Sequence, residues 1–212
     1  MSDVSTTRTT YRSRSFGRTL RRRLTLLLTL ALVGTIAAVV IAPLVQRVIN
    51  HFELPLAYAS IIRQQAAEKH LDPALIAAVI YAETRFDART SPTGAEGLMQ
   101  IEPATAEFLA HRSGGYAFNV SDLGTPQVNI AYGSYYLRYL LDEYHGSTML
   151  ALAAYNGGET NVNKWLASAA SANQTFTAAD IPLQQTRAYV SEVLSKQQAY
   201  RSRYAAQLGY GA

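Results

Sequence analysis

The chain has 212 residues, 49% of them hydrophobic and 16% charged, so it can bury one ordinary core and is not compositionally disordered. It contains no cysteine, which excludes disulfides, thiolate metal sites and thiol catalysis. The net charge is +4, but residues 1–23 hold seven arginines and one aspartate, so residues 24–212 carry a net charge of −2. A body with this charge gives little reason to expect a nucleic-acid partner.

Residues 1–23 are expected to be a basic cytoplasmic tail, of which residues 1–20, rich in serine, threonine and arginine and without periodicity, are expected to be disordered. Residues 24–45 follow without a charge, and as a helix they would span roughly 33 Å, enough for a hydrocarbon core of about 30 Å. Because signal-peptide cores are typically about 7–15 residues long, we expect an uncleaved single-pass transmembrane anchor. A cleaved signal peptide and a buried core helix are the alternatives. The arginines would keep the tail in the cytoplasm and place the following domain on the extracytoplasmic side of the cell membrane.

Residues 46–57 are expected to be a connector, and residues 58–205 a folded domain. Apolar residues recur at helical spacing through this domain, and no long stretch alternates with a period of two. We therefore expect a single all-α domain, with a small hairpin in the 112–124 loop as the open alternative. The predicted helices cover residues 58–70, 73–84, 97–112, 125–145, 147–156, 159–170 and 182–204.

The second of these helices carries one unusual residue on its apolar face. Asp72 is its expected N-cap, and Ile76, Val79 and Ile80 recur on one stripe, on which the next position is Glu83. The carboxylate either reaches solvent, where it can pair with a nearby arginine, or lies in an apolar cleft. In a cleft, desolvation would raise the pKa of the carboxyl and suit it to general acid catalysis.

Two later segments favour a cleft for a polar polymer. "SPTGAEGLMQ", residues 91–100, is a turn rich in small residues, and "AAYNGG", residues 153–158, places an aromatic ring and an amide at a helix end. Aromatic faces can stack on sugar rings, and amides can bind hydroxyl and N-acetyl groups. No HExxH, GxSxG, Walker or dinucleotide-binding motif occurs, so we expect no metal and no cofactor.

Four ordered blocks make the sequence similar to the catalytic domain of the soluble lytic transglycosylases, the SLT domain, which has a goose-type-lysozyme-like fold. The blocks are "AETRF", "SPTGAEGLMQIEPATA", "ALAAYNGG" and "IPLQQTRAYV". The resemblance covers roughly residues 56–200. It implies a carbon–oxygen lyase that cleaves the β-1,4 bond between N-acetylmuramic acid and N-acetylglucosamine in the glycan strands of bacterial peptidoglycan, leaving 1,6-anhydro ends.

The resemblance also assigns the site. Glu83 matches the family's catalytic glutamate, which protonates the glycosidic oxygen and then acts as base. Met99 would form the cleft wall, with a gap-filling core residue as the alternative, and the Tyr155 hydroxyl would point toward the catalytic carboxyl. The expected substrate-binding residues are Ser91, Met99, Gln100, Tyr155, Asn156 and Gln185.

Two departures from the family pattern stand out. The usual Glu-Ser pair is Glu83-Thr84 here, and Gln185 stands where a glutamate is common. Asp87 and Glu96 are expected to be surface and turn residues, so no second catalytic carboxylate is evident. The alternative functions are a hydrolytic muramidase and a non-catalytic peptidoglycan-binding scaffold. Four tyrosines at helical spacing are expected mainly to pack on the core: Tyr132, Tyr135, Tyr136 and Tyr139.

Overall fold

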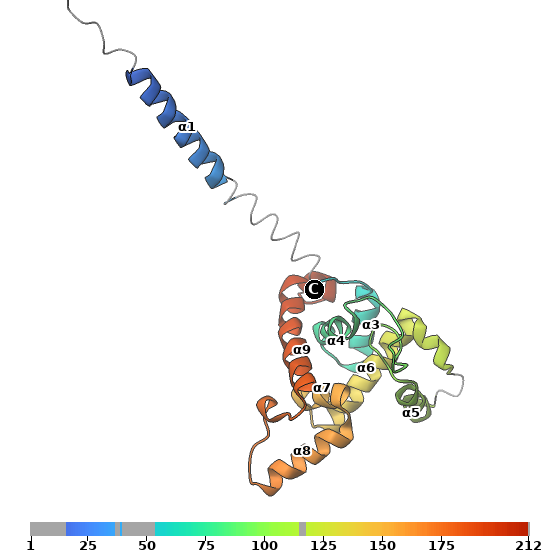
Figure 1. Cartoon of the computed structure of the whole chain (residues 1–212). Coiled ribbons are helices and arrows are strands. Elements are labelled where there is room, and N and C mark those ends of the chain that lie inside the picture. The colour runs from blue at the N-terminus through green and yellow to red at the C-terminus, as the bar shows by residue number, and fades with distance from the viewer. Residues whose placement is uncertain (1–15, 37–38, 40–53, 115–117, 212) are drawn as a thin grey trace, which may run out of the picture. The chain divides into compact units, whose positions relative to one another are not determined.

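The structure is a computed structural model that describes residues 16–36, 39, 54–114 and 118–211. The chain divides into two compact units, Met1–Glu53 and Leu54–Ala212 (Figure 1). In the first unit, helix α1 runs from Phe16 to Ile36. It begins inside the segment predicted to be a disordered tail, because arginine and leucine are good helix formers and extend the helix toward the N-terminus.

The predicted anchor, residues 24–45, is described only as far as residue 36 and at residue 39. Its remaining part lies outside the described residues, as do residues 46–53 of the predicted connector. Across the part of the chain that the structure describes, no helix has both the length and the apolar character needed to cross a membrane.

The second unit is helical, and no strand occurs among its described residues, which confirms the prediction of an all-α domain. The described part of the 112–124 loop forms a short 3₁₀ helix rather than a hairpin. The elements are α3 (Ala59–Lys69), α4 (Pro73–Thr84), α5 (Pro103–Ser113), η2 (Val120–Gly124), α6 (Pro126–Glu143), α7 (Thr148–Gly157), α8 (Glu159–Ser171), η3 (Ala178–Asp180), α9 (Gln184–Arg203) and α10 (Ala205–Leu208).

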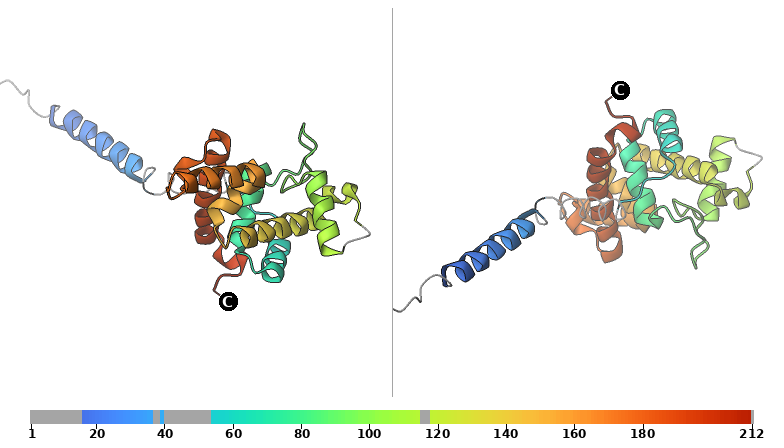
Figure 2. Two further views of the ribbon diagram at one scale, coloured as in Figure 1. Left: turned by 90° about the horizontal axis from the view of Figure 1, so that it is seen from below. Right: turned by 90° about the horizontal axis from the view of Figure 1, so that it is seen from above.

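Helix α4 is the centre of this unit. All eight residues from Ala74 to Tyr81 are buried, and three of them are alanines that allow neighbouring helices to approach closely. It packs against α3 and most extensively against α9, while α7 joins α9 to α6 and α8 (Figure 1). Helix α6 extends from α7 toward α5, as Figure 2 shows. A helix buried on all sides carries any polar residue near its end into an apolar environment.

The start of α4 is fixed by Asp72, as predicted. Its Oδ1 accepts a hydrogen bond from the Ala74 backbone N–H at 3.0 Å. Its other oxygen accepts from Arg201 of α9 at 2.6 Å, and the Tyr210 hydroxyl also bonds the carboxylate. The cap therefore ties α4 to the C-terminal part of the domain.

The predicted helix through "PATAEFLAHR" is present as α5, but its predicted start near Gly97 is wrong, since α5 begins only at Pro103. Gly97 has a φ of +74° and Gln100 a φ of +49°, and neither angle is compatible with a right-handed helix. Glu96 and Ile101 instead exchange two backbone hydrogen bonds of 2.9 and 3.0 Å. Pro103 has no N–H and suits the first helical position, which explains where the helix starts.

Candidate active site

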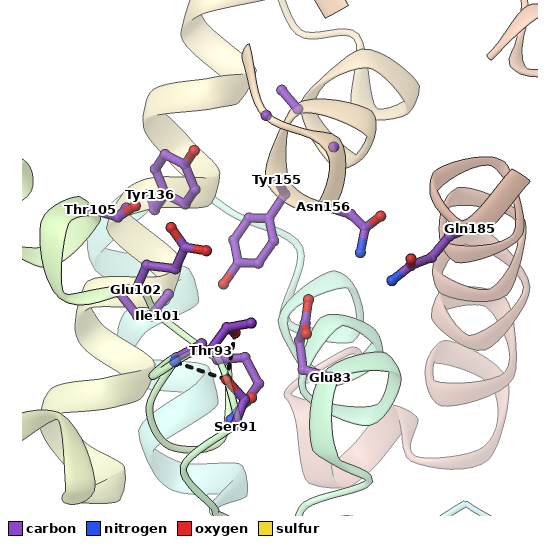
Figure 3. A pocket seen from close by; sticks show the side chains of 15 residues that line it. Glu83, Ser91, Thr93, Ile101, Glu102, Thr105, Tyr136, Tyr155, Asn156 and Gln185 are labelled. Carbon is purple, nitrogen blue, oxygen red and sulfur yellow. Dashed lines mark hydrogen bonds between the residues drawn. The ribbon is translucent and has the colours of Figure 1, made fainter. Parts of the chain in front are cut away.

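A cleft of about 500 Å³ opens at the C-terminal end of α4. It is bounded by the 91–105 segment, α6, the end of α7 and the start of α9 (Figure 3). Six of the seven predicted site residues line it, namely Glu83, Ser91, Gln100, Tyr155, Asn156 and Gln185. Among the described residues, no group of three or more histidine, aspartate or glutamate side chains is placed to hold a metal ion.

Glu83 lies in the last turn of α4 and points into the cleft (Figure 3). Burial raises the pKa of its carboxyl from the ordinary 4.5 to about 7, although the Tyr189 hydroxyl and the positive charge of Arg89 act to lower it. Desolvation outweighs both because it penalises the charged form of the acid directly. The carboxyl therefore holds its proton near neutral pH while remaining accessible from the cleft.

The chain turns away immediately after Glu83. Thr84 is buried, and its hydroxyl donates to the carbonyl of Ile80 at 3.2 Å or of Leu98 at 2.8 Å, which fastens the helix end to the next loop. Arg85 and Phe86 follow with φ angles of 53° and 66°, in the left-handed region. Threonine in place of the family's serine thus keeps a hydroxyl that positions the end of α4.

Tyr155 stands between the two sides of the cleft in Figure 3. Its hydroxyl donates to the Met99 carbonyl at 2.9 Å. Burial and, second to it, the charge of Glu83 raise the pKa of Tyr155 far above its usual range. The tyrosine is therefore a neutral hydrogen-bond donor close to the Glu83 carboxyl, and it lines the cleft.

Tyr189 of α9 is a site residue that sequence reasoning missed. Its ring is buried, and its hydroxyl has no hydrogen-bond partner of regular geometry among the described residues. The hydroxyl is nevertheless close enough to Glu83 to favour the ionised carboxylate. Its membership of the block "IPLQQTRAYV" could have indicated a site role for Tyr189. Only the packing of α9 on α4, however, places it beside Glu83.

Gln100 and Ser91 both face the cleft while they stabilise its loop. The Gln100 amide nitrogen donates to the carbonyls of Arg89 at 2.7 Å and Gly97 at 2.8 Å. The Ser91 hydroxyl accepts from the Ala95 N–H at 2.9 Å. These donors are already used, so Gln100 can offer a substrate only its carbonyl oxygen in this conformation.

Met99 is not where the prediction of a cleft wall placed it. Its side chain is fully buried and packs against Gly133 of α6, where an added Cβ would come within 2.4 Å of the Met99 sulfur. The backbone carbonyl, rather than the side chain, serves the site, because it accepts the hydrogen bond from Tyr155. The gap-filling core role was therefore the better of the two alternatives.

Asn156 and Gln185 line the cleft on the side of Glu83 away from Tyr136, and Figure 3 shows both amides pointing inward. Asn156 lies in the last turn of α7, and Gln185 lies in the first turn of α9. The two helix ends approach closely here, since a Cβ on Gly157 would lie 3.0 Å from the Thr186 hydroxyl. This part of the cleft thus offers amide donors and acceptors without a charge.

The opposite wall contains three residues that no prediction assigned to the site: Glu102, Thr105 and Tyr136. Of the four tyrosines expected to pack on the core, Tyr132, Tyr136 and Tyr139 do so but remain partly exposed. Only Tyr136 lines the cleft. Glu102 immediately precedes α5, and no local sequence pattern indicates that this position lines the cleft.

The chain is similar to known transglycosylases. The family model described as the transglycosylase SLT domain matches residues 60–176. The soluble lytic murein transglycosylase of Escherichia coli (strain K12) is 32% identical over 158 residues, which cover 72% of this chain and 24% of that protein. The chain therefore spans about a quarter of the length of this curated relative.

Two solved structures agree with these matches. The 70 kDa soluble lytic transglycosylase from Escherichia coli superposes with a TM-score of 0.68 at 28% identity, covering 78% of this chain and 28% of that one. An inactive mutant of the lytic transglycosylase Slt from Pseudomonas aeruginosa, in which a glutamate is replaced by glutamine, gives a TM-score of 0.65 at 31% identity, covering 72% and 25%. On this sequence similarity and fold, the chain belongs to the transglycosylase SLT domain family.

Proposed function

We propose that the protein is a lytic transglycosylase that cleaves the β-1,4 bond between N-acetylmuramic acid and N-acetylglucosamine in peptidoglycan. The observation that carries the proposal is the carboxyl of Glu83, whose pKa burial raises to about 7 at the floor of a cleft of about 500 Å³. A carboxyl with this pKa can both give and take a proton at neutral pH. Family membership supports the same activity.

In the first step, the Glu83 carboxyl donates its proton to the glycosidic oxygen while the bond from that oxygen to C1 of the muramic acid breaks. The 2-acetamido group of the muramic acid stabilises the positive charge that forms at C1. In the second step, the 6-hydroxyl attacks C1, and its proton passes to the Glu83 carboxylate. The products are a free 4-hydroxyl and a 1,6-anhydro end, and Glu83 is protonated again.

Two neighbours support the exchange of this proton. The Tyr189 hydroxyl and Arg89 both favour the ionised carboxylate and thus moderate the effect of burial on the pKa of Glu83. Without them the acid would hold its proton too tightly to release it to a weakly basic glycosidic oxygen. We assign substrate binding to Asn156, Gln185 and the Gln100 carbonyl oxygen, with Ser91 and Tyr155 shaping the cleft.

The test is mass analysis of the fragments that the full-length chain releases from purified peptidoglycan. Anhydro ends are lighter than reducing ends by one water, so they separate a transglycosylase from a muramidase. Glu83→Gln should abolish product formation while strand binding is retained. Reducing ends alone would replace the proposal by a hydrolase, and unchanged binding without any product from the wild-type chain would favour a scaffold.

We also propose that residues 24–45 anchor the protein in the cell membrane, with the SLT domain on the extracytoplasmic side. The support is the uncharged run itself and the Arg21-Arg22-Arg23 triplet that precedes it. Added protease should digest the SLT domain in cells whose outer layers have been made permeable but whose cell membrane is intact. A protected domain, or a chain that washes off membranes at high salt, would contradict this topology.

A further inference from the structure

Glu102 is a carboxylate in the cleft for which neither the fold nor the proposed mechanism supplies a role. It immediately precedes α5, yet its side chain makes no capping hydrogen bond to that helix. The side chain is exposed, and the described residues provide it with no ion pair or hydrogen bond. Figure 3 shows its carboxylate pointing into the cleft from the wall opposite Glu83.

No basic side chain among the described residues lines the cleft around Glu102. Its fifteen lining residues, all within the described part of the chain, include two glutamates and no lysine, arginine or histidine. Glu159, at the start of α8, does not line the cleft, but its charge acts on the lining residue Tyr136. After burial, the charge of Glu159 and, least of the causes, that of Glu102 contribute to raising the pKa of Tyr136. Arg112 lies 4.9 Å over the neighbouring Tyr139 ring and does not line the cleft. The side chains that line this wall therefore include a carboxylate and no cation, whereas Asn156 and Gln185 on the other wall are neutral.

A carboxylate can only accept hydrogen bonds, so the sugar group beside it must donate them. Hydroxyl groups can do so, but an ammonium group would gain a charge–charge attraction as well. An anionic substituent would be repelled from the same position. Glu102 thus distinguishes substrates by the charge on the part of the sugar that faces this wall.

We propose that Glu102 is a specificity-determining residue, which binds the amino group of glucosamine units that lack their N-acetyl group. The enzyme accordingly cleaves strands with free glucosamine amines better than their N-acetylated counterparts. This inference rests on the proposed function, because it concerns the substrate preference of that same cleft. It goes beyond that function because cleavage itself requires only Glu83 and its neighbours.

The experiment compares the full-length chain on two preparations of the same strands, with glucosamine either N-acetylated or freed of its acetyl group and muramic acid intact in both. Assays at about pH 6 keep the sugar amine protonated. For the wild-type chain, kcat/KM should be higher on the free-amine strands. In Glu102→Gln the ratio of the two kcat/KM values should fall about tenfold, equivalent to about 1.4 kcal/mol. The change should appear mainly in KM, since Glu102 takes no part in proton transfer.

Glu107→Gln is the matched control, because Glu107 is exposed on α5, carries the same charge and does not line the cleft. It should leave the ratio unchanged, and salt at about 0.5 M should bring the wild-type ratio toward that of Glu102→Gln. An unchanged ratio in Glu102→Gln, or an equal fall in Glu107→Gln, would overturn the inference. If the wild-type chain cleaved neither preparation, the proposed function itself would fail, which is a separate outcome.

Discussion

Replacing Glu83 by glutamine should stabilise the protein while it abolishes catalysis. Glutamine has the same shape and keeps a carbonyl oxygen that can accept a bond from Tyr189, but it carries no charge that burial can penalise. In the wild-type chain the pKa of the buried carboxyl is about 7 instead of 4.5. At about 1.4 kcal/mol per pH unit, ionising Glu83 in the folded state costs about 3 kcal/mol at pH 8.

The sign of the pH dependence follows from the raised pKa. Below about pH 4.5 Glu83 is protonated in the folded and unfolded chains alike, and its protonation does not favour unfolding. Between about pH 4.5 and pH 7 the unfolded chain loses the proton first, so the wild-type chain loses stability as the pH rises. Glu83→Gln lacks this loss, and its advantage should grow across that window and then level off.

The assay is denaturant unfolding of both chains at about pH 4, pH 6 and pH 8, with Glu107→Gln as a surface control. We expect a difference near zero at the lowest pH and about 3 kcal/mol at the highest. A difference that does not depend on pH, or a variant no more stable than wild type at pH 8, would refute the account of Glu83 as a desolvated acid. Catalysis by the variant would refute its role in the reaction.

Three further outcomes test the surroundings of Glu83. Tyr189→Phe should raise the pKa of Glu83 by about one unit, because it removes a hydroxyl that favours the ionised carboxylate. The alkaline limb of the kcat/KM profile would then move to higher pH, and an unmoved limb would contradict this role of Tyr189. Asn129→Ala should lower the free energy of unfolding by about 3 kcal/mol or more and reduce activity. The reason is that the buried Asn129 amide forms hydrogen bonds with the backbone of Met99, Glu96 and Leu123, at 2.8, 2.8 and 3.0 Å. Wild-type stability in denaturant unfolding together with wild-type turnover would contradict this. Gln185→Glu should leave the enzyme active, with kcat/KM changed by less than about tenfold. A hundredfold gain would instead identify the natural chain as a weakened enzyme.

The amide at position 185 fits the electrostatics of the cleft. Gln185 lies on the same wall as Asn156, and a second carboxylate there would raise the pKa of Glu83 further through like-charge repulsion. The cleft instead has its extra negative charge on the opposite wall, at Glu102. The cleft thus has its two carboxylates on opposite walls, and under our proposals one of them transfers protons while the other selects substrate.

The sequence alone determined the features that depend on near neighbours along the chain. The all-α class, the Asp72 cap, the end of α4 at Thr84 and the place of Glu83 on an apolar stripe all follow from periodicity and capping chemistry. The ordered motif blocks also predicted seven site residues, and six of these line one cleft. These signals are readable because residues one to four apart in a helix have a fixed geometry.

Only the tertiary structure decided which distant groups meet. Met99 turned inward because Asn129, thirty positions later, holds its backbone N–H and Gly133 makes room for its side chain. Tyr189 reaches Glu83 only through the packing of α9 on α4, and Glu102 lines the cleft from the loop just before α5 begins at Pro103. A side chain's partners across the fold depend on how whole helices pack, and local sequence patterns do not specify that packing.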